Sequence, residues 1–197
     1  MTAQPTGSPI ALMPDAAAAV TAVAEQVPAG AWSRPSPCTE WTVADVLAHL
    51  TREHLWAPHL LRGETVEQVG SRYEGDVLGD DPVAAWKRAA AGSMMAWGQA
   101  SDPEAEVSVS WGAIPVREYA HQMLTDLTVH GWDIARGAAV DPQADADAIE
   151  VAWAYQKPMA GGGSALFAAP VATDSSDRLD QLAALLGRDP SWRPPLD

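Results

Sequence analysis

The sequence predicts a mainly α-helical fold: a four-helix bundle with long connections, a short extended hairpin and an extra C-terminal helix. Four long segments carry apolar residues at the three- and four-residue spacing of a helix that buries one face. Helix-start residues precede them, such as Thr42 before the second segment and Asp81 before the third. The 197 residues suit one domain with a single hydrophobic core.

The first bundle helix is expected over residues 14–27. Pro14 and Asp15 are helix-start residues, and apolar residues follow at helical spacing. The residues before them, 1–13, are expected to form a flexible N-terminal arm. The remaining residues, 14–197, are therefore expected to form one helical-bundle domain.

The second and third helices flank a long connection. The second starts after the N-cap Thr42, and Pro58 is expected to bend or end it because proline lacks a backbone N–H. The third is expected to start at Asp81 or Pro82 and to run toward Ala100. Between them, residues 62–82 are rich in Gly and Asp and are expected to form a long surface loop, of the kind that is often functional or mobile.

The second half of the chain begins with the string "EVSVSWGAIPVREY". Apolar and polar residues alternate on each side of Trp111-Gly112, which indicates a short hairpin or an extended crossing. The longest helix is expected to open at Pro115 and to run to Arg136, with Gly137 as its C-cap. A fifth helix over 145–159 and a short final helix within 175–187 complete the expected elements.

The charge balance argues against nucleic acid and acidic membranes as partners. The net charge is −14, and the 12 basic residues are scattered rather than clustered. Phosphate-rich surfaces would repel such a chain. Nucleic acid and acidic membranes are therefore not expected as partners.

A cytoplasmic location is expected from three features. Cys38 is the only cysteine, so no internal disulfide can form. Residues 1–14 lack the basic and apolar regions of a signal peptide, and no apolar stretch approaches the ~18 residues of a spanning helix.

The string "LTDLTVHGWDIARG" raises the main functional question, because Asp126 and His130 lie one helical turn apart near an apolar face. Side chains at i and i+4 lie almost in line, so this pair can bind one ion. His49, on the apolar stripe of the second helix, is the best third ligand, whereas His54, His59 and His121 fall at poorer positions.

The set His49, Asp126 and His130 would leave an open position for water or substrate, and it suits Zn²⁺, and also Ni²⁺ or Fe²⁺. Asp133 is placed to accept a hydrogen bond from the outer nitrogen of a ligating imidazole. A surface pair or a buried hydrogen bond explains the same Asp–His spacing, so spacing alone leaves both interpretations open.

Three strings resemble a known family: "PCTEWTVADVLAHL", "LTDLTVHGWDIARG" and "DRLDQLAALLGRDPSW". They are similar to signature blocks of the DinB-like superfamily, in the branch around mycothiol-dependent maleylpyruvate isomerases and their uncharacterised actinobacterial metal-binding relatives. The resemblance implies a four-helix bundle with a divalent metal, and it implies His49, Asp126 and His130 as ligands. The isomerases have Glu where this chain has Asp126. Family members pair through helix faces, which leaves a homodimer open.

The resemblance implies a thiol-dependent transferase or isomerase that acts on a small-molecule substrate and in which the metal activates a thiol such as mycothiol. The isomerases carry a further C-terminal domain for which this chain has no room, so maleylpyruvate is not the expected substrate. A metal- or ligand-binding module without turnover and a metal-dependent hydrolase are the alternatives.

Other residues are secondary candidates. Trp132 and the 62–82 loop are candidates for shaping a cavity, and Arg52 or Arg136 for pairing with an anionic substrate. Cys38 lies in a proline-rich loop, where an inert packing role is favoured over that of a nucleophile.

Overall fold

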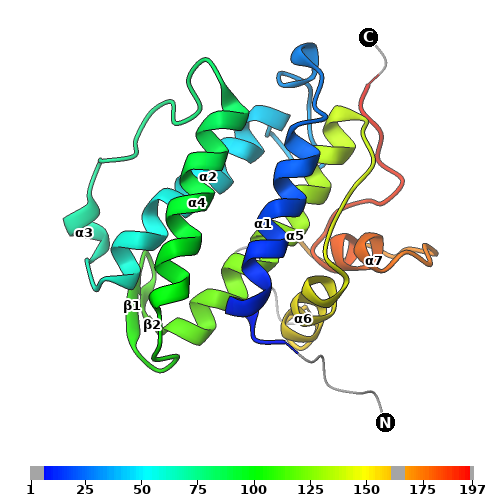
Figure 1. The fold of residues 1–197 in the computed structure, drawn as a ribbon. Helices are drawn as coiled ribbons and strands as arrows, with labels where there is room; N and C mark the ends of the chain where they lie inside the picture. The colour runs from blue at the N-terminus through cyan, green and yellow to red at the C-terminus, as the bar shows by residue number, and fades with distance from the viewer. Residues whose placement is uncertain (1–6, 161–166, 196–197) are drawn as a thin grey trace.

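The computed structural model describes residues 7–160 and 167–195, and these residues are mainly helical (Figure 1). A hairpin of two antiparallel strands, β1 and β2, is the only sheet among them. The α-helices are α1 (Pro9–Ala24), α2 (Val43–Leu61), α3 (Val66–Val69), α4 (Pro82–Gln99), α5 (Val116–Ala138), α6 (Ala146–Gln156) and α7 (Arg178–Leu185). The strands are β1 (Glu106–Val109) and β2 (Gly112–Pro115), and a short 3₁₀ helix spans Ala29–Ala31.

The four long helices α1, α2, α4 and α5 form the predicted bundle. Each packs against two others, so that α1 contacts α4 and α5, and α2 also contacts α4 and α5. Figure 1 shows α1 and α4 side by side at the front of the molecule, with α6 and α7 to the right of α5. The core between the helices is built from fully buried side chains that include Leu47, Leu50, Trp86, Leu124 and Leu127. Their burial is the main favourable term for a fold of this kind.

The N-terminal boundary differs from the expectation. The first helix begins at Pro9 rather than Pro14, so residues 9–13 are not part of a loose arm. Met13 is fully buried in the bundle core, and its burial offsets the backbone hydrogen bond that the helix loses at Pro14. Residues 1–6 of the expected arm lie outside the described residues.

The second helix starts as predicted and continues further. The Thr42 side chain accepts a hydrogen bond from the backbone N–H of Asp45, whose carboxylate in turn accepts one from the Thr42 N–H. This reciprocal pair satisfies two donors that the helix leaves free. Pro58 lies inside the last turn, and the helix ends at Leu61.

The expected 62–82 surface loop is partly ordered and partly buried. It contains α3, whose N-cap Thr65 and Gln68 form a second reciprocal cap. Val69 and Leu78 are buried, so the segment packs on the bundle with part of its apolar surface. The predicted surface loop therefore contains one short helix and two buried apolar residues.

The end of α5 also corrects the sequence interpretation. Gly137 lies within the helix, and Ala139 takes the left-handed conformation as C-cap. A Cβ on Gly137 would come within 2.6 Å of Val43 Cγ2 and 3.0 Å of the Pro35 carbonyl oxygen. This glycine therefore serves the close packing of α5 against the start of α2.

The predicted hairpin is present, with Val109 paired to Gly112 across the turn at Trp111. Helices α6 and α7 form two small apolar clusters with α5, to which α5 contributes Val129 and Trp132. No helix in the described part of the chain is long and apolar enough to cross a membrane.

Candidate metal centre

Helix α5 passes through the middle of the molecule, and this placement buries its polar residues. His130 is 5% exposed and Asp133 is fully buried, while the Asp126 side chain keeps 25% of its surface exposed. Buried polar groups of this kind are costly unless they are paired or hold a ligand. The partners of these three side chains therefore define the site.

The structure brings together the three predicted ligands. One ligand atom from each of His49, Asp126 and His130 lies within 4.8 Å of the other two. His49 Nε2 lies 3.4 Å from Asp126 Oδ2, and the two imidazole rings are 5.0 Å apart at 74°. The described residues include a second group of this kind, Cys38 with His130 and Asp133. Metal binding at His49, Asp126 and His130 stays a prediction at this point.

Asp133 orients the His130 ring, as its position in the sequence suggested. His130 Nδ1 and Asp133 Oδ2 are 2.9 Å apart. Burial by itself would raise the pKa of Asp133, but the positive charge of Arg188 and the bond with His130 lower it below its usual range. An ionised Asp133 accepts the Nδ1–H of His130, so that Nε2 is left to face His49 and Asp126.

Arg188 was not identified from the sequence. It follows α7, is 7% exposed, and donates to Asp133 Oδ2 at 3.0 Å. Its spacing from Asp133 is 55 residues, so no local pattern could have indicated the contact.

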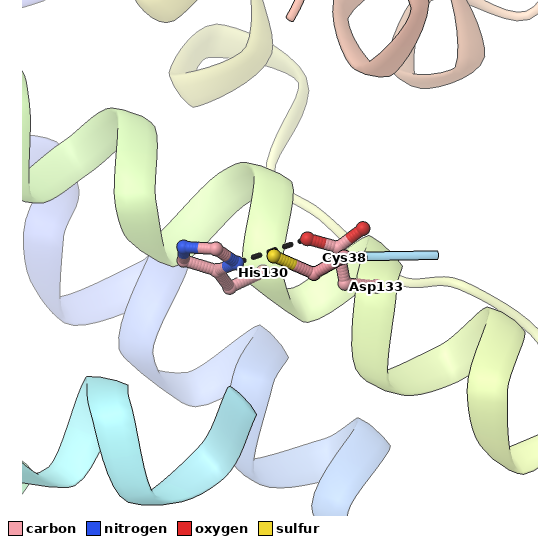
Figure 2. A group of neighbouring side chains, drawn as sticks. All are labelled: Cys38, His130 and Asp133. Carbon is pink, nitrogen blue, oxygen red and sulfur yellow. Dashed lines mark hydrogen bonds and ion pairs between the residues drawn. The ribbon is translucent and has the colours of Figure 1, made fainter. Parts of the chain in front are cut away.

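Cys38 lies beside the same pair, as Figure 2 shows, with its thiol next to the hydrogen bond between His130 and Asp133. Arg188 Nη2 is 3.8 Å from Cys38 Sγ and also contacts Asp133. A guanidinium cation thus already neutralises this carboxylate, which argues against a metal ion among Cys38, His130 and Asp133. Burial and the negative charge of Asp133 raise the pKa of the Cys38 thiol, so it is a poor nucleophile, in agreement with the packing role predicted for it.

His49 and Asp126 influence each other's protonation. Burial by itself lowers the pKa of His49, but its hydrogen bond with Asp126 and the charge of that carboxylate raise the pKa above its usual value. For Asp126, burial acts to raise the pKa, and the bond with His49 and the charge of His130 lower it. A bound cation could therefore take the place of the proton shared between His49 and Asp126.

The site opens into a cavity of about 770 Å³. His49, Asp126 and His130 lie on its wall, and Trp41 covers both imidazoles with ring distances of 5.1 and 6.0 Å. Much of the remaining wall is apolar or aromatic, with Trp56, Trp111, Tyr119, Met123 and Phe167 among its residues. Of these, Trp111 projects from the hairpin turn and is 58% exposed.

Glu53 is a second functional candidate that the sequence interpretation missed. It lies one helical turn after His49 on α2 and lines the cavity. Burial raises the pKa of its carboxyl group, and it makes no hydrogen bond or ion pair with another described residue. The i, i+4 spacing from His49 was the sequence signal that could have indicated it.

The other predicted candidates are distributed over the fold. Trp132 does not line the cavity; it is fully buried and donates to Asp180 at 2.8 Å, so its predicted role in shaping the cavity was wrong. Arg136 also lies away from the cavity and pairs with Asp180. From the 62–82 segment, Val66 reaches the cavity wall.

Three histidines lie outside the ligand group. His54 is buried against Ser93, His59 contacts Glu64 and Tyr73, and His121 stacks on Tyr155. Among the histidines of α2, His49 is the one that the structure groups with Asp126 and His130.

Comparison with known proteins places the bundle in a family. The mycothiol maleylpyruvate isomerase N-terminal domain family matches residues 13–135. This chain belongs to that family. Two uncharacterised proteins, from two strains of Mycobacterium tuberculosis, are each 29% identical over 164 residues, covering 78% of this chain and 83% of their own length. No solved structure matches the fold significantly. The matched residues include His49, Asp126 and His130, whereas Arg188 and the whole of α6 and α7 lie beyond them.

Proposed function

We propose that this protein binds a divalent metal ion between His49, Asp126 and His130 and uses it to transfer or isomerise substrates through a low-molecular-weight thiol. The observation that carries the proposal is the convergence of two imidazoles and one carboxylate, from two helices, on the wall of a deep cavity. Three protein ligands of these types suit Zn²⁺ best, and also Ni²⁺ or Fe²⁺, and they leave a position for an exogenous group.

The chemistry that the ion supplies when bound is the deprotonation of a coordinated thiol, which gives a nucleophile at neutral pH. The chain contributes by holding the donors. Asp133 fixes the His130 ring, and the cover provided by Trp41 limits the access of water to both imidazoles. His49 and Asp126 remain about one quarter exposed, so the site stays open on the cavity side.

The description of the family supplies a candidate thiol, mycothiol. A polar thiol of this kind would enter from the cavity, where its sulfur can approach the three ligands. The family's isomerase activity is also compatible with the site, because reversible addition of a thiolate to a conjugated double bond permits rotation about it.

The cavity wall favours an uncharged, largely apolar electrophile. Aromatic side chains such as Trp56, Tyr119 and Phe167 offer apolar area and ring faces. Glu53 and Glu118 add negative charge to the same wall. A dicarboxylate would be repelled by these groups.

The arginines that reach the cavity already make hydrogen bonds within the protein. Arg52 donates to the backbone carbonyls of Tyr73 and Gly75, and Arg188 donates to Asp133. Both guanidinium groups are therefore engaged within the protein. Maleylpyruvate, which carries two carboxylates, fits this cavity less well than a neutral substrate.

The test combines metal content with thiol transfer. The chain, purified without chelator, is expected to hold one equivalent of Zn²⁺ and, with mycothiol, to accelerate conjugation of the uncharged electrophile chlorodinitrobenzene. The variant His130→Ala should lose both properties. His121→Ala is the matched control, because His121 lies on the same helix but does not line the cavity.

The outcomes separate the competing functions. Zinc binding without turnover for any thiol would favour a metal-binding module. Absence of zinc from wild type under conditions that saturate other zinc proteins would contradict the proposal. An equal loss of zinc in His130→Ala and His121→Ala would show that folding, rather than ligation, had been disturbed.

A metal-dependent hydrolase is the second candidate, and Glu53 is the observation that favours it. Its carboxyl group lies in the same cavity, burial raises its pKa, and it makes no hydrogen bond or ion pair with the described residues. Such a group can accept a proton from an attacking water molecule. Hydrolysis of an ester substrate that needs Glu53 but no thiol would favour this candidate.

A further inference from the structure

We infer that Arg188, from a segment outside the family-matched domain, is a positioning residue of the metal centre: it holds Asp133, and through Asp133 it holds the ligand His130. This inference rests on the proposed function, because it assigns a role toward the metal. It is carried by three contacts that form a continuous chain from the C-terminal segment to the ligand.

The end of α7 delivers Arg188 to this place. Gly187 takes a left-handed conformation with φ of 85°, which suits glycine. Its N–H donates to the Ala184 carbonyl at 3.1 Å, and the Arg188 N–H donates to the Ala183 carbonyl at 2.9 Å. This pair of bonds is the Schellman arrangement that ends many helices. The backbone direction of Arg188 is thus fixed before its side chain makes any contact.

The Arg188 side chain is fixed at several points. Nη1 donates to the Leu186 carbonyl at 2.9 Å, and the guanidinium lies 5.6 Å from the centre of the Phe167 ring. The remaining donors face Asp133, with Nη2 at 3.0 Å from Oδ2 and Nε at 3.4 Å from Oδ1. A guanidinium group held this way fixes the carboxylate that accepts its hydrogen bonds in one orientation.

Asp133 passes that orientation to the ligand. Its Oδ2 accepts from Arg188 and lies 2.9 Å from His130 Nδ1, so the same oxygen serves both partners. Asp133 is fully buried. Without Arg188, its carboxylate would be an unpaired buried charge that either rotates or takes a proton, and the His130 ring would lose its fixed acceptor.

A second arginine on the α5–α7 contact provides a matched control. Arg136 Nη2 donates to Asp180 Oδ1 at 2.7 Å and therefore also ties α5 to α7. It lies outside the cavity and makes no contact with Asp133 in the described part of the structure. Loss of Arg136 loosens the same helix contact without touching the chain of bonds that leads to His130.

The experiment measures Zn²⁺ affinity by competition with a chelator, and the absorption spectrum of the Co²⁺-substituted protein, in full-length wild type, R188Q, R188K and R136Q. We expect R188Q to weaken Zn²⁺ binding 10- to 100-fold, roughly the range for partners of metal ligands, and to change the Co²⁺ spectrum. R188K should recover part of the affinity because it keeps the charge but not the fork. R136Q should leave both properties unchanged.

R188Q is expected to fold less stably, because it leaves Asp133 buried and unpaired. The double variant R188M/D133N removes both charges and avoids this problem. It should fold, and it should bind Zn²⁺ at least about 10-fold more weakly than wild type, since an amide oxygen is a weaker acceptor for His130.

Each outcome is decisive. Wild-type affinity in R188Q or in the double variant, or equal losses in R188Q and R136Q, would overturn the role of Arg188 while leaving the proposed function intact. A wild-type protein that binds no Zn²⁺ would overturn the proposed function, and the inference with it.

Discussion

Two histidines five residues apart on α2 have opposite surroundings. His54 is fully buried between α2 and α4, where its Nδ1 lies 2.8 Å from Ser93 Oγ and its ring meets Trp86 edge-on at 5.1 Å. His49 faces α5, keeps 26% of its side chain exposed and lies beside Asp126 and His130. Burial lowers the pKa of His54 to about 3, whereas Asp126 raises that of His49 despite burial.

Depth of burial therefore does not decide which of the two histidines is placed to join a cation site. The more deeply buried residue has a neutral hydroxyl partner and serves packing, while the half-buried one has acidic and imidazole partners at a cavity. A cation site needs charged or lone-pair donors that converge on accessible space, and only His49 of these two meets that condition.

Removal of His49 should affect metal binding far more than removal of His54. We expect His49→Ala to weaken Zn²⁺ binding at least about 1,000-fold, beyond the 10- to 100-fold range of residues that only support ligands. His54→Gln should leave the affinity unchanged. Competition with a chelator measures both, and a similar loss in the two variants would remove the distinction between them.

Stability should show the reverse order. His54→Ala removes a packed ring and leaves Ser93 without its partner, so the free energy of unfolding should fall by about 3 kcal/mol. His49→Ala, measured without metal, should change it by about 0.5 kcal/mol or less because the side chain is partly exposed. Urea unfolding in the presence of chelator tests this, with circular dichroism as the probe.

Metal itself should stabilise the fold through His49 and not through His54. At a free Zn²⁺ concentration of about 100 times the dissociation constant, wild type should gain about 2.7 kcal/mol relative to chelated protein. His54→Gln should gain as much, and His49→Ala should gain nothing at that concentration. Thermal unfolding with and without chelator gives the comparison, and a stabilisation that persists in His49→Ala would place the ion elsewhere.

The pH dependence of stability should have opposite signs at the two positions. The unfolded chain binds a proton at His54 near pH 6.5 and the folded chain near pH 3, so His54 costs stability as the pH falls through this window, by about 1.4 kcal/mol per unit. His49 has a raised pKa, so its contribution is present below pH 6.5 and is lost as the pH rises above that value.

Unfolding of metal-free wild type, His54→Gln and His49→Gln between pH 4.5 and 8 measures these slopes. His54→Gln should show a shallower loss at low pH than wild type, and His49→Gln a shallower loss at high pH. Identical profiles for wild type and His54→Gln would show that His54 is not buried as a neutral ring.

Much of the bundle was predictable because its signals are local. The Thr42 cap, the hairpin turn at Ser110 and Trp111, and the apolar stripes depend on residues within a few positions of each other. The predicted helix boundaries were wrong where packing between helices determined where a helix begins or ends. Helix α1 extends back to Pro9 because Met13 reaches the core. Gly137 lies inside α5, where a side chain would collide with Val43 and the Pro35 carbonyl, so it serves packing rather than the end of the helix.

The proximity of His49, Asp126 and His130 was partly predictable, because it also depends on helical spacing. Asp126 and His130 share a helix face by spacing alone, and the phase of His49 on α2 turned it inward. The sequence also suggested that Asp133 would support a ligand, and the bond to His130 has that geometry. Glu53 lies one turn from His49 and was overlooked although its spacing carried a signal.

The sequence by itself determined which residues share a helix face, since helical periodicity is a property of neighbouring positions. It therefore determined the bundle helices and the pairing of Asp126 with His130. Only the tertiary structure decided that Arg188 meets Asp133, that Cys38 lies beside both, and that Trp132 turns toward Asp180 and away from the cavity. Such contacts join segments up to 150 residues apart, and they depend on how whole helices pack, which spacing along one helix does not encode.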